Sequence, residues 1–270
     1  MSALDIVIEG IGVWSAELSN WAASCDVLCT DVFSTEVEKV LNAASRPAPS
    51  LLAPTERRRA PDSVLLAIEV AQQACAMTGR DPRDLPNVFA SAFGDLAIND
   101  YLCATLARSP QDMSPTKFHN SVHNAPAGYW SIATGCMESS TAISAGAATF
   151  GAGLLEAALL AQRESRAVLL AAYDIAAVGP IADIVPCRTA FGVALVLAPA
   201  SPRAVAHLRV QPQHAATTEL ASAAGVLHAC HRDNPAARGL PLLTALARRE
   251  PQTLMLAAGA CVNLRMEISF

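Results

Sequence analysis

The chain has 270 residues, of which 52% are hydrophobic and only 16% are charged, so it carries enough apolar material for one large domain with a buried core. Its net charge is −5, and its densest basic cluster is a run of three arginines between Thr55 and Asp62, which is too little for a nucleic-acid-binding surface. The first ten residues, MSALDIVIEG, include two acids and no basic run, so they do not resemble a secretory signal.

A membrane span is not expected either. The uncharged stretch Ser139–Leu155 is too short and too rich in Gly, Ala and Ser to cross a bilayer. We therefore expect a cytoplasmic protein. The eight cysteines are scattered along the chain, and without an export signal they are expected to be small buried hydrophobic residues instead of a disulfide framework.

The first half of the chain alternates between strand-like and helix-like segments. A strand is predicted at Leu4–Ile8, ending at the sequence Gly-Ile-Gly, and a buried strand at Asn87–Asp95. A helix is predicted at Asp62–Gly79, where the glycine closes the last turn, and another near Asn99–Ala107.

The alternation continues through the second half. A loop leads into a helix that runs from near Pro126 to Gly135, and a strand and a helix follow within Ser140–Gln162. The remaining predictions are strands at 166–174, 190–199 and 203–212, a helix at 239–249, and one or two strands at 253–269. This order is typical of an α/β layered fold with a mixed sheet.

The segment Ser140–Gln162 has the pattern of a catalytic turn. A β-prone run enters a bend of small residues and an amphipathic helix follows, as at the strand-to-helix bends that carry nucleophiles. The bend consists of Gly146, Ala147 and Ala148, and none of these side chains can attack a carbonyl group. The scaffold of a nucleophile elbow is therefore present without its nucleophile.

Other residues are weaker candidates for chemistry. His119 and His123 are four residues apart, but Pro126 marks the start of the next helix and no further ligand stands at motif spacing, so hydrogen-bonded loop histidines are favoured over a metal site. Cys136 is a candidate thiol nucleophile, with a buried cysteine as the ordinary alternative. The segment His228–Asp233 is expected to be a surface loop. We expect no cofactor, because no complete cofactor motif is present.

Three segments, FHNSVHNAPAGYWSIATG, SSTAISAGAATFGAGLLEA and AVLLAAYD, together resemble the N-terminal half of β-ketoacyl synthases, the condensing enzymes of the thiolase fold. The N-x-x-A-G motif of that family matches Asn124, Ala127 and Gly128. The resemblance covers roughly residues 1–200, with motif-level likeness over about 115–175. Within the superfamily, the chain is most similar to short ketosynthase-like proteins known as chain-length or chain-initiation factors, which occur in bacterial aryl polyene and xanthomonadin-type pigment clusters.

The resemblance implies a fold for residues 1–200, and the small size of the remaining segment indicates what residues 201–270 add. Residues 1–200 would form a thiolase-like half, a layered α-β-α arrangement with a mixed five-stranded sheet. Residues 201–270 are expected to add a small β-α-β extension packed on the same domain, as a cap over the surface that a second half would otherwise cover.

Two departures from the family pattern decide the expected mechanism. The family's active-site cysteine falls on Ala147, and the H-G-T and G-H motifs that supply its two histidines do not occur after residue 200. Condensation needs a thiolate to carry the acyl chain and histidines to assist decarboxylation. We therefore expect that this chain alone does not catalyse condensation.

The resemblance implies a partner protein instead. In that fold, the strand before the nucleophile pairs with its counterpart across the dimer, and the loop before the N-x-x-A-G helix reaches the neighbour's acyl pocket. The interface strand would comprise Ser139, Ser140, Thr141, Ala142, Ile143, Ser144 and Ala145. The residues lining the partner's tunnel would be Lys117, Phe118, His119, Asn120, Ser121, His123 and Asn124. Phe118 is the first candidate for a plug, with core packing as its alternative, and Asn124 is expected to fix the loop through side-chain hydrogen bonds to the backbone.

These features lead to one main hypothesis and two alternatives. In the main hypothesis, the chain is a non-catalytic partner subunit that forms a heterodimer with a catalytic ketosynthase and shapes its acyl tunnel, with an acyl carrier protein as a further candidate partner. The alternatives are a stand-alone acyltransferase or decarboxylase that uses a thiol such as Cys136, and a self-associating scaffold protein.

Overall fold

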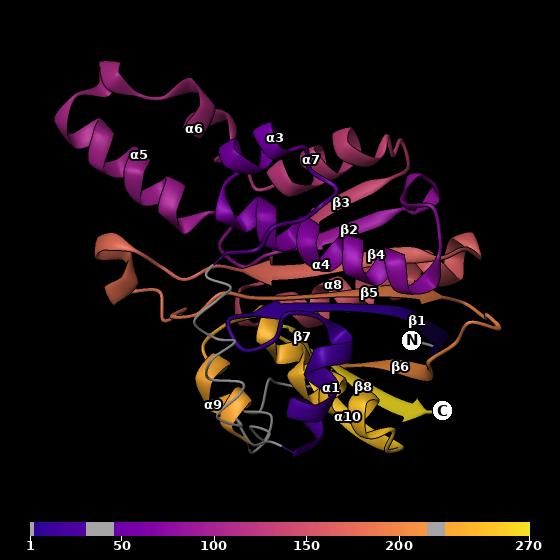
Figure 1. The fold of residues 1–270 in the computed structure, drawn as a ribbon. Coiled ribbons are helices and arrows are strands. Elements are labelled where there is room, and N and C mark those ends of the chain that lie inside the picture. Colours follow the sequence, from indigo (N-terminus) through magenta and orange to yellow (C-terminus); the bar gives the residue numbers. More distant parts are fainter. Residues whose placement is uncertain (1–2, 31–45, 215–224) are drawn as a thin grey trace.

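The computed structural model describes residues 3–30, 46–214 and 225–270, and one eight-stranded sheet runs through this part of the chain (Figure 1). The order of the strands across the sheet is β3-β2-β4-β5-β1-β6-β8-β7. The strands are β1 (Leu4–Ser15), β2 (Asn87–Ala90), β3 (Ser140–Ile143), β4 (Val168–Asp174), β5 (Phe191–Ala198), β6 (Ala206–His214), β7 (Gln252–Gly259) and β8 (Val262–Ser269).

Helices and short 3₁₀ turns connect these strands. The helices are α1 (Trp21–Thr30), α3 (Pro54–Arg59), α4 (Asp62–Thr78), α5 (Leu96–Arg108), α6 (Pro115–His119), α7 (Ala125–Thr134), α8 (Thr149–Glu164), α9 (Val226–His231) and α10 (Leu240–Arg248). The 3₁₀ turns are η1 (Pro82–Asp84), η2 (Pro110–Asp112), η3 (Gly146–Ala148), η4 (Gly179–Asp183) and η5 (Ala236–Gly239). Within the described ranges, no helix has both the length and the apolar character needed to cross a membrane.

The predicted α/β fold with a mixed sheet is confirmed. Strands β3, β2 and β4 are parallel, whereas β5 is antiparallel to both β4 and β1. The helices predicted around residues 62–79 and 126–135 are α4 and α7, and each ends at a glycine in the left-handed conformation, Gly79 with φ 66° and Gly135 with φ 73°. Only glycine adopts this conformation without steric cost, so these two ends could be predicted from the sequence.

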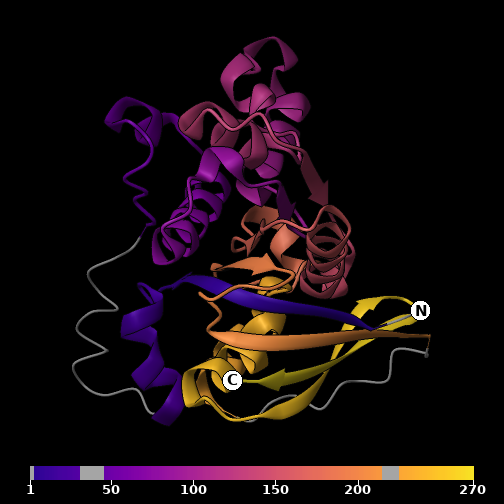
Figure 2. The ribbon, with the colours of Figure 1, turned by 90° about the vertical axis from the view of Figure 1, so that its right-hand side faces the viewer.

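The five strands predicted for residues 1–200 are β1 to β5, and the sheet continues beyond them. Strand β1 has 12 residues, and its first part, Leu4–Ile8, pairs with β6 on the side opposite β5. Strands β8 and β7 continue the sheet outward from β6 (Figure 2). The described part of residues 201–270 thus has the predicted β-α-β order, with β6, α9, α10 and β7, and adds β8 as a further strand. Its strands pair edge to edge with the rest of the sheet, because the edge of β1 would otherwise leave backbone N–H and C=O groups unpaired.

The predicted end of the first strand is wrong, since β1 continues through Gly10 and Gly12 to Ser15. A Cβ atom at Gly10 would overlap the carbonyl oxygen of Ala74, and one at Gly12 would overlap that of Val70. Both carbonyls belong to α4, which crosses β1 at close range. The glycines therefore permit the close approach of a helix, and they do not form a turn.

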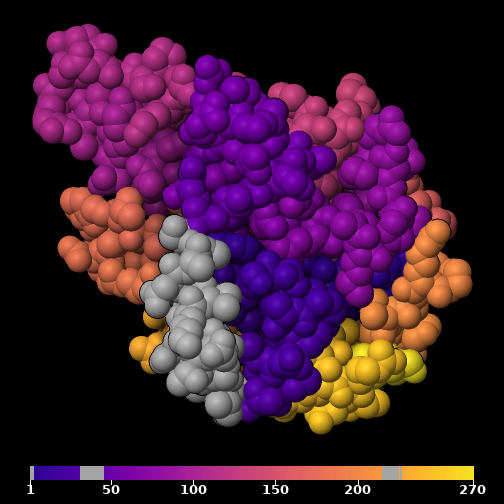
Figure 3. Space-filling model, in the orientation of Figure 1, coloured from indigo at the N-terminus to yellow at the C-terminus, as the bar shows by residue number. Residues whose placement is uncertain are grey.

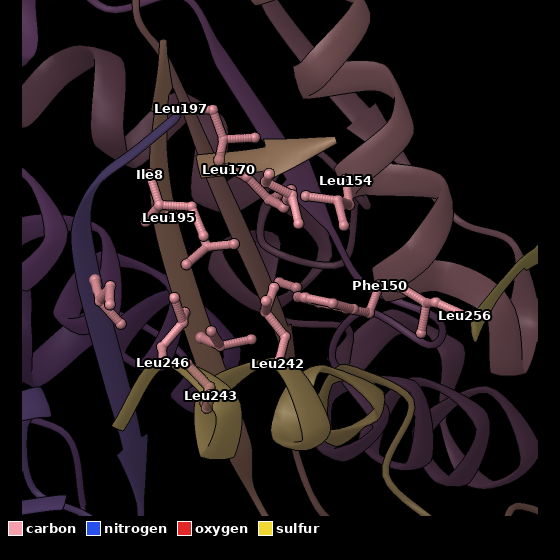
Figure 4. Close-up of a cluster of buried hydrophobic side chains, with 14 of the residues drawn as sticks. Ile8, Phe150, Leu154, Leu170, Leu195, Leu197, Leu242, Leu243, Leu246 and Leu256 are labelled. Carbon is pink, nitrogen blue, oxygen red and sulfur yellow. The ribbon is translucent and has the colours of Figure 1, made fainter. Parts of the chain in front are cut away.

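Apolar side chains from the two faces of the sheet form separate cores. On one face, α4 packs across β1, β5 and β4, and α7 contributes Trp130, whose ring centre lies 6.3 Å from that of Phe89. On the other face, the core combines α8 and α10 with the sheet (Figure 4). Its members include Ile8, Phe150, Leu154, Leu170, Leu195, Leu197, Leu242, Leu243, Leu246 and Leu256.

Candidate functional site

Strand β3 lies at one outer edge of the sheet and is hydrogen-bonded only to β2 among the described strands. Four of the seven residues predicted as an interface strand, Ser140–Ile143, belong to it, and Ser139, Ser144 and Ala145 flank it. Ser140 and Ala142 are exposed, and Thr141 and Ile143 are half-buried. The segment is therefore an accessible edge strand, as its predicted role requires.

The turn after β3 has the geometry of a strand-to-helix elbow. Gly146, in the left-handed conformation with φ 56°, starts the turn η3, and Thr149 starts α8. The buried Thr149 hydroxyl accepts a hydrogen bond from the Ala145 amide at 2.9 Å and donates one to the Gly146 carbonyl at 2.7 Å. Ala147 is exposed at the centre of this turn. A methyl group thus occupies the centre of the turn, where the resemblance described above predicts the position of the family's cysteine.

Residues 96–122, which include α5, η2 and α6, form an arm that projects from the body of the protein (Figures 1 and 3). Lys117, Phe118 and His119 lie on α6 and are exposed. Phe118 has 64% of its surface accessible, so core packing does not explain it in this chain. The Lys117 ammonium lies 3.9 Å from the centre of the Tyr101 ring, a cation–π contact that joins α6 to α5.

The rest of the predicted tunnel loop returns from the arm to the body. Asn120 is buried and its Oδ1 accepts a hydrogen bond from the Tyr129 hydroxyl at 3.3 Å, whereas Ser121 is half-buried. The His123 ring is half-buried, with Nε2 2.8 Å from the Ser91 carbonyl oxygen. Because a carbonyl oxygen only accepts, Nε2 carries the proton. His123 is therefore a hydrogen-bonded loop histidine, as predicted.

The expectation for Asn124 is wrong. Its side chain is exposed and makes no capping hydrogen bond to the first turn of α7. The loop is held instead by His123 and Asn120, whose partners lie outside α6. The spacing of these residues in the sequence did not indicate which of Asn120, His123 and Asn124 fixes the loop.

The connection from β2 to α5, Ser91–Asp95, is the root of the arm and is held by two buried carboxyl groups. Asp174, at the end of β4, accepts hydrogen bonds at Oδ1 from the Ser91 hydroxyl at 2.9 Å, the Ala92 amide at 2.9 Å and the Phe93 amide at 3.2 Å. Asp95 caps α5 by accepting from the Ile98 amide at 2.8 Å, and its Oδ2 accepts from the Ser63 hydroxyl at 2.8 Å.

Burial raises the pKa of Asp174 to about 7, although the hydrogen bonds from Ser91, Phe93 and Ala92 act in the opposite direction. Its second oxygen, Oδ2, is buried and has no hydrogen-bond partner within 3.5 Å among the described residues, although the Ala236 amide also faces this carboxyl group. No sequence motif singled out Asp174. The available signal was an acidic residue at the end of an apolar central strand, where sheets of this class place functional groups.

A second buried network lies at the same end of the sheet. The His231 ring makes two hydrogen bonds, one of 2.7 Å between Nδ1 and the Thr189 hydroxyl and one of 2.8 Å between Nε2 and the Glu17 carboxylate. Ser15 donates a further bond of 2.7 Å to Glu17. Burial raises the pKa of Glu17, but the hydrogen bonds from His231 and Ser15 outweigh it and hold this pKa below its usual value.

The expectation of a surface loop at His228–Asp233 is therefore wrong, because His231 is buried at the end of α9. Its network joins α9 to the end of β1 and the start of β5. Among the described residues, no three His, Cys, Asp or Glu side chains are arranged so that they could hold a metal ion.

Comparison with known proteins identifies the family of this chain. Residues 34–255 match the family model described as the N-terminal domain of β-ketoacyl synthases. The chain belongs to this family. No curated protein matches the sequence.

Solved structures share the fold of this ketosynthase-family chain over nearly its whole length. One similar structure is the complex of the ketosynthase ApeO with its chain length factor ApeC from Xenorhabdus doucetiae. The matched chain of that complex is 22% identical in sequence, with a TM-score of 0.71, and the match covers 98% of this chain and 99% of the matched chain. A second is AntDE:AntF, a type II PKS acyl-carrier protein in complex with its ketosynthase bound to the hexaketide. The matched chain is 11% identical, with a TM-score of 0.72, and the match covers 99% of this chain and 99% of the matched chain. The ishigamide ketosynthase/chain length factor is 13% identical, with a TM-score of 0.68 and coverage of 98% and 99%. At these identities, the likeness establishes a shared fold.

The buried thiols of this ketosynthase-family chain are poorly placed for nucleophilic chemistry. Cys136 is only 2% exposed, and its Sγ lies 3.5 Å from the Leu85 carbonyl oxygen, to which it donates. Burial, with a smaller effect of Cys136, raises the pKa of Cys75 to about 12. Burial, with a smaller effect of Asp174, likewise raises that of Cys187 to about 12. A thioester substrate cannot reach Cys136 without local opening, and the other two remain protonated at neutral pH.

Proposed function

We propose that this chain is a non-catalytic, chain-length-factor-like subunit that forms a heterodimer with a catalytic ketosynthase of type II polyketide or fatty-acid-type synthesis, in the cytoplasm. In this role it shapes the acyl tunnel of the partner during the assembly of polyene-type chains. The observation that carries the proposal is an exposed edge strand, β3, that leads directly into a nucleophile elbow occupied by Ala147.

The chemistry of the elbow supports a non-catalytic role. A condensing enzyme must hold the acyl chain as a thioester, and the Ala147 methyl group cannot form one. Cys136 does not replace it, because this thiol is buried against Leu85. The strand and the turn of an elbow are nevertheless present. Their retention without a nucleophile supports a role as a surface that matches another subunit.

The surroundings of β3 support an interface. Ile132 on α7 is 87% exposed and Met137, between α7 and β3, is 92% exposed. Large exposed apolar side chains beside an edge strand are typical of protein–protein contacts. A partner that covers them pairs the backbone N–H and C=O groups of the strand and removes apolar surface from water. We therefore place the ketosynthase on β3, with Ile132 and Met137 inside the contact.

The arm supports a role at the partner's tunnel. Phe118 stands on a projecting helix with most of its ring in solvent, and Val122 at the base of the same segment is 52% exposed. Apolar groups on such an arm are stabilised when they enter an apolar cavity of a neighbour. The acyl carrier protein is a further candidate partner, since one similar structure contains a carrier protein bound to its ketosynthase.

The test is co-expression of this chain with the ketosynthase encoded nearest to it, followed by co-purification. A stable complex is expected for the wild type, and Ile132→Glu combined with Met137→Glu should abolish it, because two buried charges oppose association. Met255→Glu is the matched control, since Met255 is exposed on β7 at the opposite edge of the sheet. If the wild type forms no complex, or only self-associates, the proposal is wrong.

The same complex tests the role of the arm. Phe118→Ala should leave complex formation intact and shift the products towards longer chains, because a smaller side chain leaves more of the tunnel open. The length distribution is read by mass spectrometry of the released products. An unchanged length distribution would contradict the proposed position of Phe118 in the tunnel, but it would not contradict the heterodimer.

A further inference from the structure

We propose that Asp174, Ser91 and His123 form a clamp that fixes both ends of the arm at one point and so sets how far the arm enters the partner's tunnel. These are positioning residues, which act on product length through the arm. Their effect on products rests on the proposed function, whereas the clamp itself is a property of the isolated chain.

The outgoing end of the arm is fixed through Asp174. Its Oδ1 receives three hydrogen bonds from consecutive residues, Ser91, Ala92 and Phe93. The Ser91 hydroxyl also accepts from the Gly94 amide at 2.9 Å, where the backbone takes a left-handed conformation with φ 64°. A single buried carboxyl group thus determines the path of the chain as it leaves β2.

The returning end of the arm is fixed at the same residue. After α6, the chain comes back to the body, and the Nε2–H of His123 donates to the Ser91 carbonyl at 2.8 Å. The ring also lies against Gly94. The side chain of Ser91 therefore holds the start of the arm while its carbonyl group holds the end.

The clamp also contacts the interface strand and its elbow. The Ser91 amide donates to the Ile143 carbonyl at 3.1 Å, and the Ser144 hydroxyl donates to the Ala92 carbonyl at 3.1 Å. Ser144 lies three residues before Ala147. The root of the arm and the end of β3 thus form one connected unit, so a partner seated on β3 has a fixed relation to the arm.

Within the arm, local contacts make it move as one piece. The Tyr101 hydroxyl accepts from the Ser114 amide at 3.2 Å, and the Tyr101 ring carries the Lys117 ammonium. These contacts connect α5 to α6 across the arm. Because the arm is braced internally and tied to the body at its root, its direction depends on the clamp.

Hydrogen–deuterium exchange on the isolated chain tests the clamp without any partner. In His123→Ala, amides at 91–95 and 121–124 should exchange about 5- to 10-fold faster than in the wild type, because one hydrogen bond that closes the arm is lost. His123→Gln, whose amide group can donate to the same carbonyl, should restore part of the protection. His207→Ala on the exposed face of β6 is the matched control.

Product length in the ketosynthase complex tests the consequence. Asp174→Ala, and Ser91→Ala should the first variant fail to fold, should broaden the length distribution while the amount of complex stays unchanged. Neither side chain is among those proposed to line the tunnel, so a direct contact with the acyl chain does not account for this result. Unchanged exchange in His123→Ala overturns the clamp. Faster exchange with an unchanged product distribution overturns its role in length control, and the absence of a wild-type complex instead contradicts the proposed function.

Discussion

Asp174 is a carboxyl group placed in the interior of the protein at the end of β4. Burial raises its pKa to about 7, whereas an aspartate in an unfolded chain titrates near pH 4 (about 3.9). Between these values the folded protein holds a proton that the unfolded chain has released. The contribution of Asp174 to stability is therefore greatest at low pH and is lost as the pH rises through this window.

Replacement of Asp174 by Asn tests this dependence. Asn remains neutral, and its Oδ1 can accept the same hydrogen bonds from Ser91, Ala92 and Phe93. Relative to Asp174→Asn, the free energy of unfolding of the wild type should fall by up to about 4 kcal/mol between pH 4 and pH 8, as three units of pKa imply. Urea unfolding at several pH values measures this, with Asp183→Asn on the surface as control. Parallel curves for Asp174→Asn and the wild type would contradict a raised pKa.

Individual residues at this end of the sheet were harder to predict than their surroundings. The sequence identified the loop around His123, because Pro126 marks the start of the next helix, but it assigned the fixing role to Asn124. It also placed His231 on the surface. The difference depends on contacts with Ser91, Glu17 and Thr189, which are remote in sequence, and local patterns contain no information about them.

At the scale of elements, helices α4 and α7 were predicted closely because their ends depend on local features such as proline and glycine. The length of β1 was not predicted, because its glycines are required by the close approach of α4, which lies far along the chain. The same kind of contact occurs at Gly151, near the start of α8. A Cβ atom there would overlap the carbonyl oxygen of Ala257 on β7.

Gly151→Ala should therefore destabilise the protein even though alanine favours helices. The overlap is with backbone atoms, which cannot rotate away, so a loss of about 1–3 kcal/mol in the free energy of unfolding is expected. Gly128→Ala on α7 is the matched control, since a Cβ atom there has no neighbour within 4 Å. It should stabilise the isolated chain by about 0.5–1 kcal/mol. Thermal or urea unfolding checks both, and equal effects of the two variants would argue against close packing of α8 on β7.

At the scale of the whole molecule, the sheet and one of its cores cross the boundary that the sequence suggested between residues 1–200 and 201–270. The resemblance covered the first part and offered no template for the second, so the pairing of β6 with β1 was not predicted. On α8, Phe150 and Leu154 share a core with Leu242 and Leu243 of α10. We propose that the two parts form one folding unit, in which the extension covers α8 and stabilises the elbow.

The variant Leu243→Ala tests whether the two parts of the chain unfold as one unit or as two. Leu243 is fully buried on α10, in a core that also includes side chains of β1 and β5, so its truncation should cost about 2–5 kcal/mol. If the parts unfold together, amides of β4 and β5 should lose protection against exchange by the same free energy as those of α10, with a single unfolding transition. Leu106→Ala on the exposed face of the arm is the control and should change stability by less than about 0.5 kcal/mol. Loss of protection confined to residues 225–270 would show that the extension unfolds independently, and the elbow would then not depend on it.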